Sequence, residues 1–273
     1  LMNPFAEPLL WMILAPALAT LALLFVPYEN KGLARRISVG ASFLTVLLAL
    51  HVCVGYDTAL AAQGEDFSQF GYVKEWVPSL GIHLRLGVDG ISAVMCLLTS
   101  IVIFAGSLVS CTVEDRPKEF YLLLMALVTG VFGVFTSLDL FFFYFFYELA
   151  VIPMYLLIGV WGSTNKQYAS MKLTLYLTAG AVAALLGVAL IYSQTGSFDL
   201  AAMRDAIAAG DLSLADQNLV FPLLLFGFGA IAPMWPLHTW SPGGHAAAPS
   251  AASMLHAGVL MKLGTYGILR IGM

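Results

Sequence analysis

Glu148 and Lys262 each stand inside a long apolar run, where an ionised side chain is costly. Glu148 follows seven consecutive aromatic residues, 141–147, and Lys262 lies within the apolar segment 258–264. An ionised group at the centre of a bilayer costs about 3 kcal/mol on insertion scales. Such residues normally face a bundle interior and carry protons, ions or substrate, and a structural ion pair between helices is the alternative. We therefore expect Glu148 and Lys262 to take part in proton or ion transfer.

Three histidines, His238, His245 and His256, follow one another closely. Imidazole titrates near neutral pH and can therefore pass protons. Their spacings of 7 and 11 residues match no metal-binding motif, so we expect no metal site. His256 and Lys262 lie about 120° apart on an ideal helix. They could line one hydrated path if Gly258 marks a distortion, and a structural, hydrogen-bonded role is the alternative for His256.

Prolines interrupt the helices that should position these side chains. Pro233 and Pro236 deprive the carbonyls of Gly229 and Ala232 of their usual helical partners. The spacing predicts either a discontinuous helix beside a water-filled path or a simple exit into a loop. Pro153, five residues after Glu148, predicts a freed carbonyl or a tolerated kink.

Three further charges stand near predicted helix starts. Lys172 is either an anchor at the membrane surface or a polar partner that points inwards. Asp89 and Asp139 immediately precede apolar runs, which favours an N-cap role for both carboxylates.

The composition indicates a membrane protein. Of the 273 residues, 60% are hydrophobic and 10% are charged, and the mean hydropathy is +0.89. Soluble domains contain about 25% charged residues. A soluble enzyme, a disordered chain and a nucleic-acid binder are therefore excluded, and the net charge of −4 provides no basic surface for nucleic acid. The sequence has no phosphate-binding glycine loop, no activated nucleophile and no CxxC pair, so we expect no cofactor in this chain.

We predict an all-α polytopic bundle of about eight spanning helices in a single membrane domain, residues 1–273. The spans lie at about 9–26, 37–55, 90–111, 120–135, 138–160, 168–191, from 219 onward with a break, and 249–271. Polar stretches at 56–88 and 195–217 separate them, and the second includes an amphipathic piece at 200–209. We expect no cleaved signal peptide. A start at Leu1 and an end directly after an apolar run favour a fragment.

Lysine and arginine residues predict the orientation. One side of the membrane holds the connections between spans one and two, three and four, and five and six. Seven lysine and arginine residues lie on that side, and four lie on the other side. The excess places those short connections in the cytoplasm, and the N-terminus and both long polar stretches outside.

Several segments resemble the antiporter-like membrane subunits of respiratory complex I, in particular the chain M (subunit 4) type. The segment 135–149, together with 152–155, resembles the fifth helix of that family. The segment 236–249 resembles its loop between helices seven and eight, 257–267 resembles its eighth helix, and 86–92 resembles the segment before its third.

The resemblance implies about fourteen helices with two inverted repeats, of which this chain holds helices 1–3 (about 9–111) and the first repeat (about 119–273). The helix-five glutamate of the family corresponds to Glu148 and its helix-eight lysine to Lys262. Its helix-seven lysine corresponds to Ile231, so the usual glutamate–lysine pair cannot form. Either His256 or Lys262 takes part of that role, or this half-channel works differently. Restoring the lysine should be tolerated if the pocket is hydrated.

The resemblance also implies a function. The chain would be a proton-translocating membrane-arm subunit of a proton-pumping NADH:quinone oxidoreductase, driven by quinone reduction elsewhere in the complex. Its partners would be other membrane-arm subunits, including neighbouring antiporter-like ones, in a bacterial inner membrane. The alternatives are a Na⁺/H⁺ antiporter or membrane-hydrogenase subunit, and a structural subunit without a proton path. The residues expected to relay protons are Glu148, Lys262, His256, His238 and Lys172.

Overall fold

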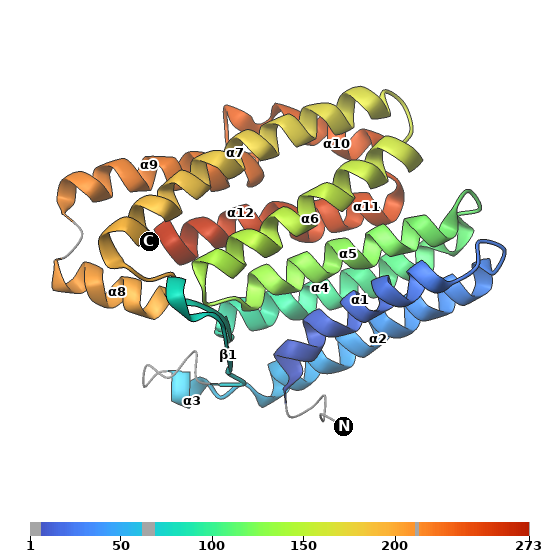
Figure 1. Cartoon of the computed structure of the whole chain (residues 1–273). Helices are drawn as coiled ribbons and strands as arrows, with labels where there is room; N and C mark the ends of the chain where they lie inside the picture. Colours follow the sequence, from blue (N-terminus) through green and yellow to red (C-terminus); the bar gives the residue numbers. More distant parts are fainter. Residues whose placement is uncertain (1–6, 62–68, 211–212, 273) are drawn as a thin grey trace.

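Long apolar runs of the sequence form long helices that lie side by side in one bundle (Figure 1). The computed structural model describes residues 7–61, 69–210 and 213–272. Within these ranges, seven helices are long and apolar enough to cross a membrane. They are α1 (Pro8–Phe25), α2 (Lys31–Gly55), α4 (Gly90–Val109) with the short η3 (Ser110–Thr112), α5 (Pro117–Thr136), α6 (Leu140–Trp161), α7 (Lys166–Thr195) and α9 (Leu214–Ile231).

The eighth predicted span is an irregular helical run. It consists of α11 (Ser250–Leu255), η5 (His256–Leu260), α12 (Met261–Gly267) and η6 (Ile268–Gly272), and both η5 and η6 are π-helical. Gly258 lies inside η5, so the local distortion is confirmed. We refer to these four segments together as the eighth run.

The seventh span is discontinuous, as the prolines predicted. Helix α9 ends at Ile231, and the chain continues through η4 (Leu237–Trp240) and α10 (Ser241–Ala247). Of the two carbonyls expected to be freed, that of Gly229 accepts from the Met234 N–H at 2.9 Å. The neighbouring Ala230 carbonyl accepts from the Trp240 indole N–H at 2.9 Å. Hydrogen bonds therefore replace part of the helical pattern that is lost at the break.

A small β-hairpin, which the sequence did not predict, covers one end of the bundle. Strand β1 (Tyr72–Val77) pairs antiparallel with β2 (Ile82–Leu86) across η2 (Pro78–Leu80), and α3 (Thr58–Ala61) precedes them. The amphipathic helix α8 (Leu200–Ala209), which was predicted, lies at the same end (Figure 1). We call this the hairpin end and the opposite end of the bundle the loop end. The division of the chain near residue 119 stays a prediction.

Glycines on α5 fix the position of α6. A Cβ atom on Gly130 would lie 2.6 Å from the Phe146 carbonyl oxygen, and one on Gly133 would overlap the Phe146 ring. The two helices therefore pack more closely than larger residues would allow. Because this contact surrounds residue 146, it sets the depth and rotation of Glu148, half a turn further along α6.

Both predicted acidic caps are confirmed. Asp89 accepts from the Ser92 N–H at 2.7 Å at the start of α4, and Asp139 accepts from the Phe141 and Phe142 N–H groups at the start of α6. Asp139 also accepts from the His83 N–H on β2 at 3.1 Å, which joins the hairpin to α6. Burial raises the pKa of the Asp139 carboxyl above its ordinary value.

Candidate functional site

Glu148 lies about 12 Å into α6 from its first residue, counted at 1.5 Å per residue. Its Oε1 atom is buried and has no hydrogen-bond partner among the described residues. Tyr144, one turn earlier, interacts with the carboxylate by a side-chain hydrogen bond. No ion pair among the described residues includes Glu148. The carboxylate is thus deep in the helix and lacks a direct cationic partner.

His256 lies buried in the π-helical segment η5, between two other rings. The His245 ring stacks on it with centroids 4.1 Å apart, and the Trp240 ring lies 5.1 Å away on a tilted plane. Neither ring nitrogen of His256 has a hydrogen-bond partner among the described residues. His245, in contrast, places its Nδ1 atom 3.2 Å from Ser253 Oγ. The broken seventh span and the distorted eighth run therefore meet at a pair of imidazoles.

Lys262 points away from the described bundle. Its side chain is exposed, as are those of Ala257, Thr265 and Leu269 on the same run. Its ammonium group donates to the Ala257 carbonyl, and the lysine also lies within electrostatic reach of His245. The structure therefore brings Lys262 near the histidine pair, and it does not pair Lys262 with Glu148.

Lys172 on α7 and His238 on η4 lie near the break. The Lys172 ammonium lies 5.9 Å and 6.0 Å from the ring centroids of Tyr168 and Tyr176. The Tyr176 hydroxyl lies 3.0 Å from Thr239 Oγ1, which connects α7 to η4. His238, the neighbour of Thr239, has a buried Nδ1 atom without a partner among the described residues. Lys172 thus lies next to a polar connection that leads to the helix break.

Ile231 occupies the position that, by the resemblance described above, corresponds to the helix-seven lysine of the family. Its side chain is 1% exposed and belongs to the apolar core. The structure shows no ion pair of Glu148 with α9 among the described residues, consistent with the isoleucine.

One buried ion pair was missed by the sequence analysis. Arg270 in η6 and Asp89 at the start of α4 lie 3.0 Å apart. The sequence predicted Asp89 only as a cap, and it gave Arg270 no individual role. The sequence showed only an arginine near the end of an apolar helix. That position does not identify Asp89, 181 residues earlier in the chain, as its partner.

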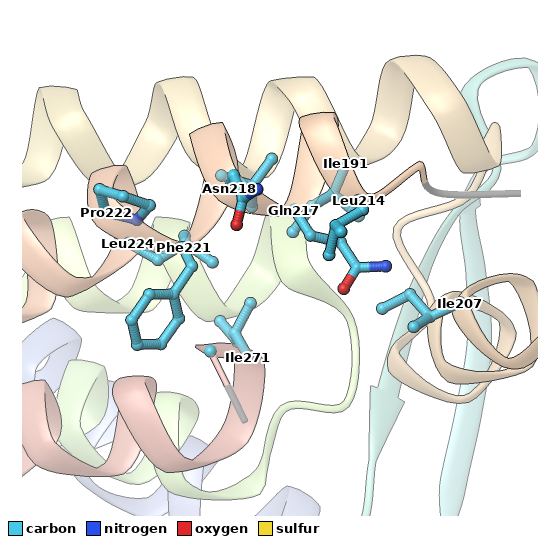
Figure 2. Close-up of a pocket in the computed structure, with 11 residues that line it drawn as sticks. Ile191, Ile207, Leu214, Gln217, Asn218, Phe221, Pro222, Leu224 and Ile271 are labelled. Atoms are coloured by element: carbon cyan, nitrogen blue, oxygen red, sulfur yellow. The ribbon is translucent and has the colours of Figure 1, made fainter. Parts of the chain in front are cut away.

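The described residues contain no group of three or more histidine, cysteine, aspartate or glutamate side chains placed to hold a metal ion. A cavity of about 390 Å³ opens between α7, α8, α9 and η6 (Figure 2). Its lining is mainly apolar, with the amides of Gln217 and Asn218, and it includes no acid, base or histidine. The ionisable residues therefore lie outside this cavity.

Comparisons with known proteins concern the family and the fold of the chain. Residues 137–273 match the family model described as "NADH:quinone oxidoreductase/Mrp antiporter, TM". NADH-quinone oxidoreductase subunit M of Rickettsia prowazekii is 34% identical over 265 residues, which cover 95% of this chain and 52% of that protein. The chain thus spans about half the length of the curated relatives that it matches.

Two solved structures share the fold. A chain of respiratory complex I from Thermus thermophilus superposes with a TM-score of 0.80 and 25% identity, covering 98% of this chain and 52% of that one. A chain of an archaeal membrane-bound sulfane sulfur reductase superposes with a TM-score of 0.83 and 25% identity, covering 97% and 53%.

Proposed function

Because this chain belongs to the family of NADH:quinone oxidoreductase and Mrp antiporter membrane subunits, we propose that it moves protons across the membrane as a subunit of an NADH:quinone oxidoreductase. The chain contributes to the enzyme as a translocating subunit and breaks no covalent bond except those to the relayed protons. Quinone reduction occurs elsewhere in the complex, and this chain needs no cofactor of its own. Its partners are other membrane-arm subunits, including neighbouring antiporter-like chains.

The seven long apolar helices within the described ranges make the chain a multi-pass membrane protein, and its bacterial relatives indicate the bacterial inner membrane. The exposed apolar side chains of α2, α4 and α7 suit contact with lipid tails or with apolar surfaces of neighbouring subunits.

Glu148 carries this proposal: its side chain is half-buried, and its Oε1 atom is buried without a hydrogen-bond partner among the described residues. A carboxyl group with an oxygen that lacks a protein partner can exchange a proton with water inside the bundle. Moving one charge through about 150 mV takes roughly 3.5 kcal/mol. That energy corresponds to a pKa change of about 2.6 units, which the approach or departure of one nearby charge can produce.

We expect the other relay groups to lie in the following order, counted from the loop end of the bundle. Lys172 lies six residues into α7, next to the Tyr176–Thr239 connection that leads to His238. The His245–His256 pair comes next, and Lys262 lies within electrostatic reach of it. We assign Glu148 the role of the carboxylate loaded from the cytoplasm and Lys262 that of the central relay. Water molecules would connect the groups that do not touch.

The direct test replaces the carboxyl group and keeps its shape. In the complex reconstituted into sealed vesicles, Glu148→Gln should lower the number of protons moved per NADH oxidised, whereas Glu148→Asp should keep part of it. Glu119→Gln is the matched control, because Glu119 is a partly exposed glutamate that pairs with Arg116 near the loop end. An unchanged proton yield in Glu148→Gln, with normal assembly, would show that the chain is structural or that its path avoids Glu148.

A further inference from the structure

The aromatic run before Glu148 contains two hydroxyl groups, those of Tyr144 and Tyr147. Residues four apart lie on the same face of an α-helix, whereas neighbouring residues point about 100° apart. Tyr144 therefore shares one face of α6 with Glu148, and Tyr147 points in a different direction. The relay described above gives neither tyrosine a role.

Tyr144 contacts the carboxylate directly. A side-chain hydrogen bond joins the Tyr144 hydroxyl to Glu148, and the phenol is the donor because an ionised carboxylate only accepts. The Oε1 atom of Glu148 is buried without a hydrogen-bond partner among the described residues, so the bond from Tyr144 falls on Oε2. The two carboxylate oxygens therefore have different surroundings: Oε2 is occupied and Oε1 is free.

Packing restricts the position of the Tyr144 ring. Tyr147 is 1% exposed, and its hydroxyl donates to the Leu177 carbonyl on α7 at 3.5 Å. The Tyr144 ring lies 6.3 Å from the Tyr147 ring, on a plane tilted by 56°, and packs against the apolar core. The hydroxyl that Tyr144 offers to Glu148 is thus carried by a ring whose neighbours are themselves held in place.

We propose that Tyr144 is a positioning residue that fixes the orientation of the Glu148 carboxyl group and leaves Oε1 as the oxygen that takes up and releases the proton. This inference rests on the proposed function. A hydronium ion of the internal water chain transfers a proton to Oε1, which forms an O–H bond and leaves a water molecule. Oε2 becomes the carbonyl oxygen and continues to accept from the Tyr144 hydroxyl. Release of the proton from Oε1 to water restores the carboxylate, and Tyr144 neither gains nor loses a proton.

The orientation matters because the last torsion of a glutamate side chain is broad and roughly two-fold. Without a fixed partner, rotation about this bond exchanges the two oxygens. Proton transfer requires the donor and the acceptor to lie within hydrogen-bond reach of each other, directly or through one water molecule. A bond from Tyr144 to Oε2 keeps the other oxygen, Oε1, directed to the same place in every cycle.

The test is Tyr144→Phe, which removes the hydroxyl and keeps the ring. Both neighbours of Tyr144 in the chain are phenylalanines, so we expect the complex to assemble. The number of protons moved per NADH should be lower than in the unsubstituted complex and higher than in Glu148→Gln. In infrared difference spectra, the carbonyl band that is lost in Glu148→Gln should move to higher wavenumber, because a hydrogen bond to a carbonyl oxygen lowers its stretching frequency. A ring with only a packing role would not shift this band.

Tyr147→Phe is the matched control. It makes the same chemical change next to Glu148, on a hydroxyl that bonds the backbone of α7. We expect the band position and the proton yield to be unchanged. Tyr144→Phe combined with Glu148→Gln should give the yield of Glu148→Gln alone, because a positioning residue acts only through the group that it positions.

Three results would decide against Tyr144. An unchanged band position in Tyr144→Phe, or an unchanged proton yield, would overturn the positioning role and leave the proposed function intact while Glu148→Gln is impaired. A further loss when Tyr144→Phe is added to Glu148→Gln would show that the tyrosine acts independently of the carboxylate. A normal yield in Glu148→Gln would instead refute the proposed function itself.

Discussion

His245 and His256 lie ring on ring, with centroids 4.1 Å apart and planes 28° from parallel. The two residues belong to α10 and η5, so the stack joins the broken seventh span to the distorted eighth run. Two positively charged imidazoles at this distance would repel each other, so the pair holds one extra proton, and with it one positive charge, more readily than two. This relationship suits a relay that passes single protons between the loop end and Lys262.

His256→Phe tests the stack without removing a ring. Phenylalanine keeps an aromatic side chain between Trp240 and His245 and removes two buried nitrogens that have no partner among the described residues. We expect normal assembly and a lowered number of protons per NADH. His51→Phe, an exposed histidine on α2, is the matched control. If His256→Phe pumps normally, the histidine pair has only a packing role.

Ile231→Lys should destabilise this protein. We expect a lysine here to be tolerated only if the side chain lies in a hydrated pocket. Ile231 is instead 1% exposed and packs within the apolar core. A buried charge without a partner costs several kcal/mol or changes its protonation state. We expect a lower melting temperature in detergent for Ile231→Lys and a near-normal one for Ile231→Met. Equal melting temperatures would show that water or Glu148 reaches this side chain.

Asp139 makes stability depend on pH at the hairpin end. Burial raises its pKa above the ordinary value of 3.8, so the folded protein holds this proton more strongly than the unfolded chain. The resulting stabilisation is complete below pH 3.8 and is lost as the pH rises through the higher folded pKa. Asp139→Asn keeps a capping side chain and removes the titration.

We therefore expect the melting temperature of Asp139→Asn, relative to that of the unsubstituted protein, to increase as the pH rises from below 3.8 to neutral. The comparison cancels the other groups that titrate in the same range. A constant difference, or one that decreases with pH, would contradict the assignment of burial as the dominant effect on Asp139.

Most of the fold could be predicted from the lengths of the apolar segments and from the positions of helix-breaking residues. The spans, the amphipathic helix α8, the break after Ile231 and the caps at Asp89 and Asp139 all follow from local patterns, and the structure confirms them. The hairpin was missed because β1 is almost wholly exposed and shows little alternation in burial. Gly258 indicated a distortion within η5, whereas η6 has no comparable local signal in its residues.

Long-range relationships could not be predicted in the same way. The pairing of Asp89 with Arg270 depends on how α4 packs against the eighth run, which no periodicity within either helix encodes. The same reason applies to Glu148 and Lys262. Their depth in the membrane follows from the sequence, whereas the directions in which they point follow from packing, such as the contact of Gly130 with α6.

The most direct test of the account is to observe the proton on Glu148 itself. Infrared difference spectra of the complex, recorded between its resting state and turnover with NADH and quinone, report the carbonyl stretch of protonated carboxyl groups. The account predicts a carboxyl band that changes during turnover and disappears in Glu148→Gln while the band pattern of Glu119→Gln is unchanged. A difference spectrum that is identical in Glu148→Gln and the unsubstituted complex would contradict the claim that this carboxylate carries protons.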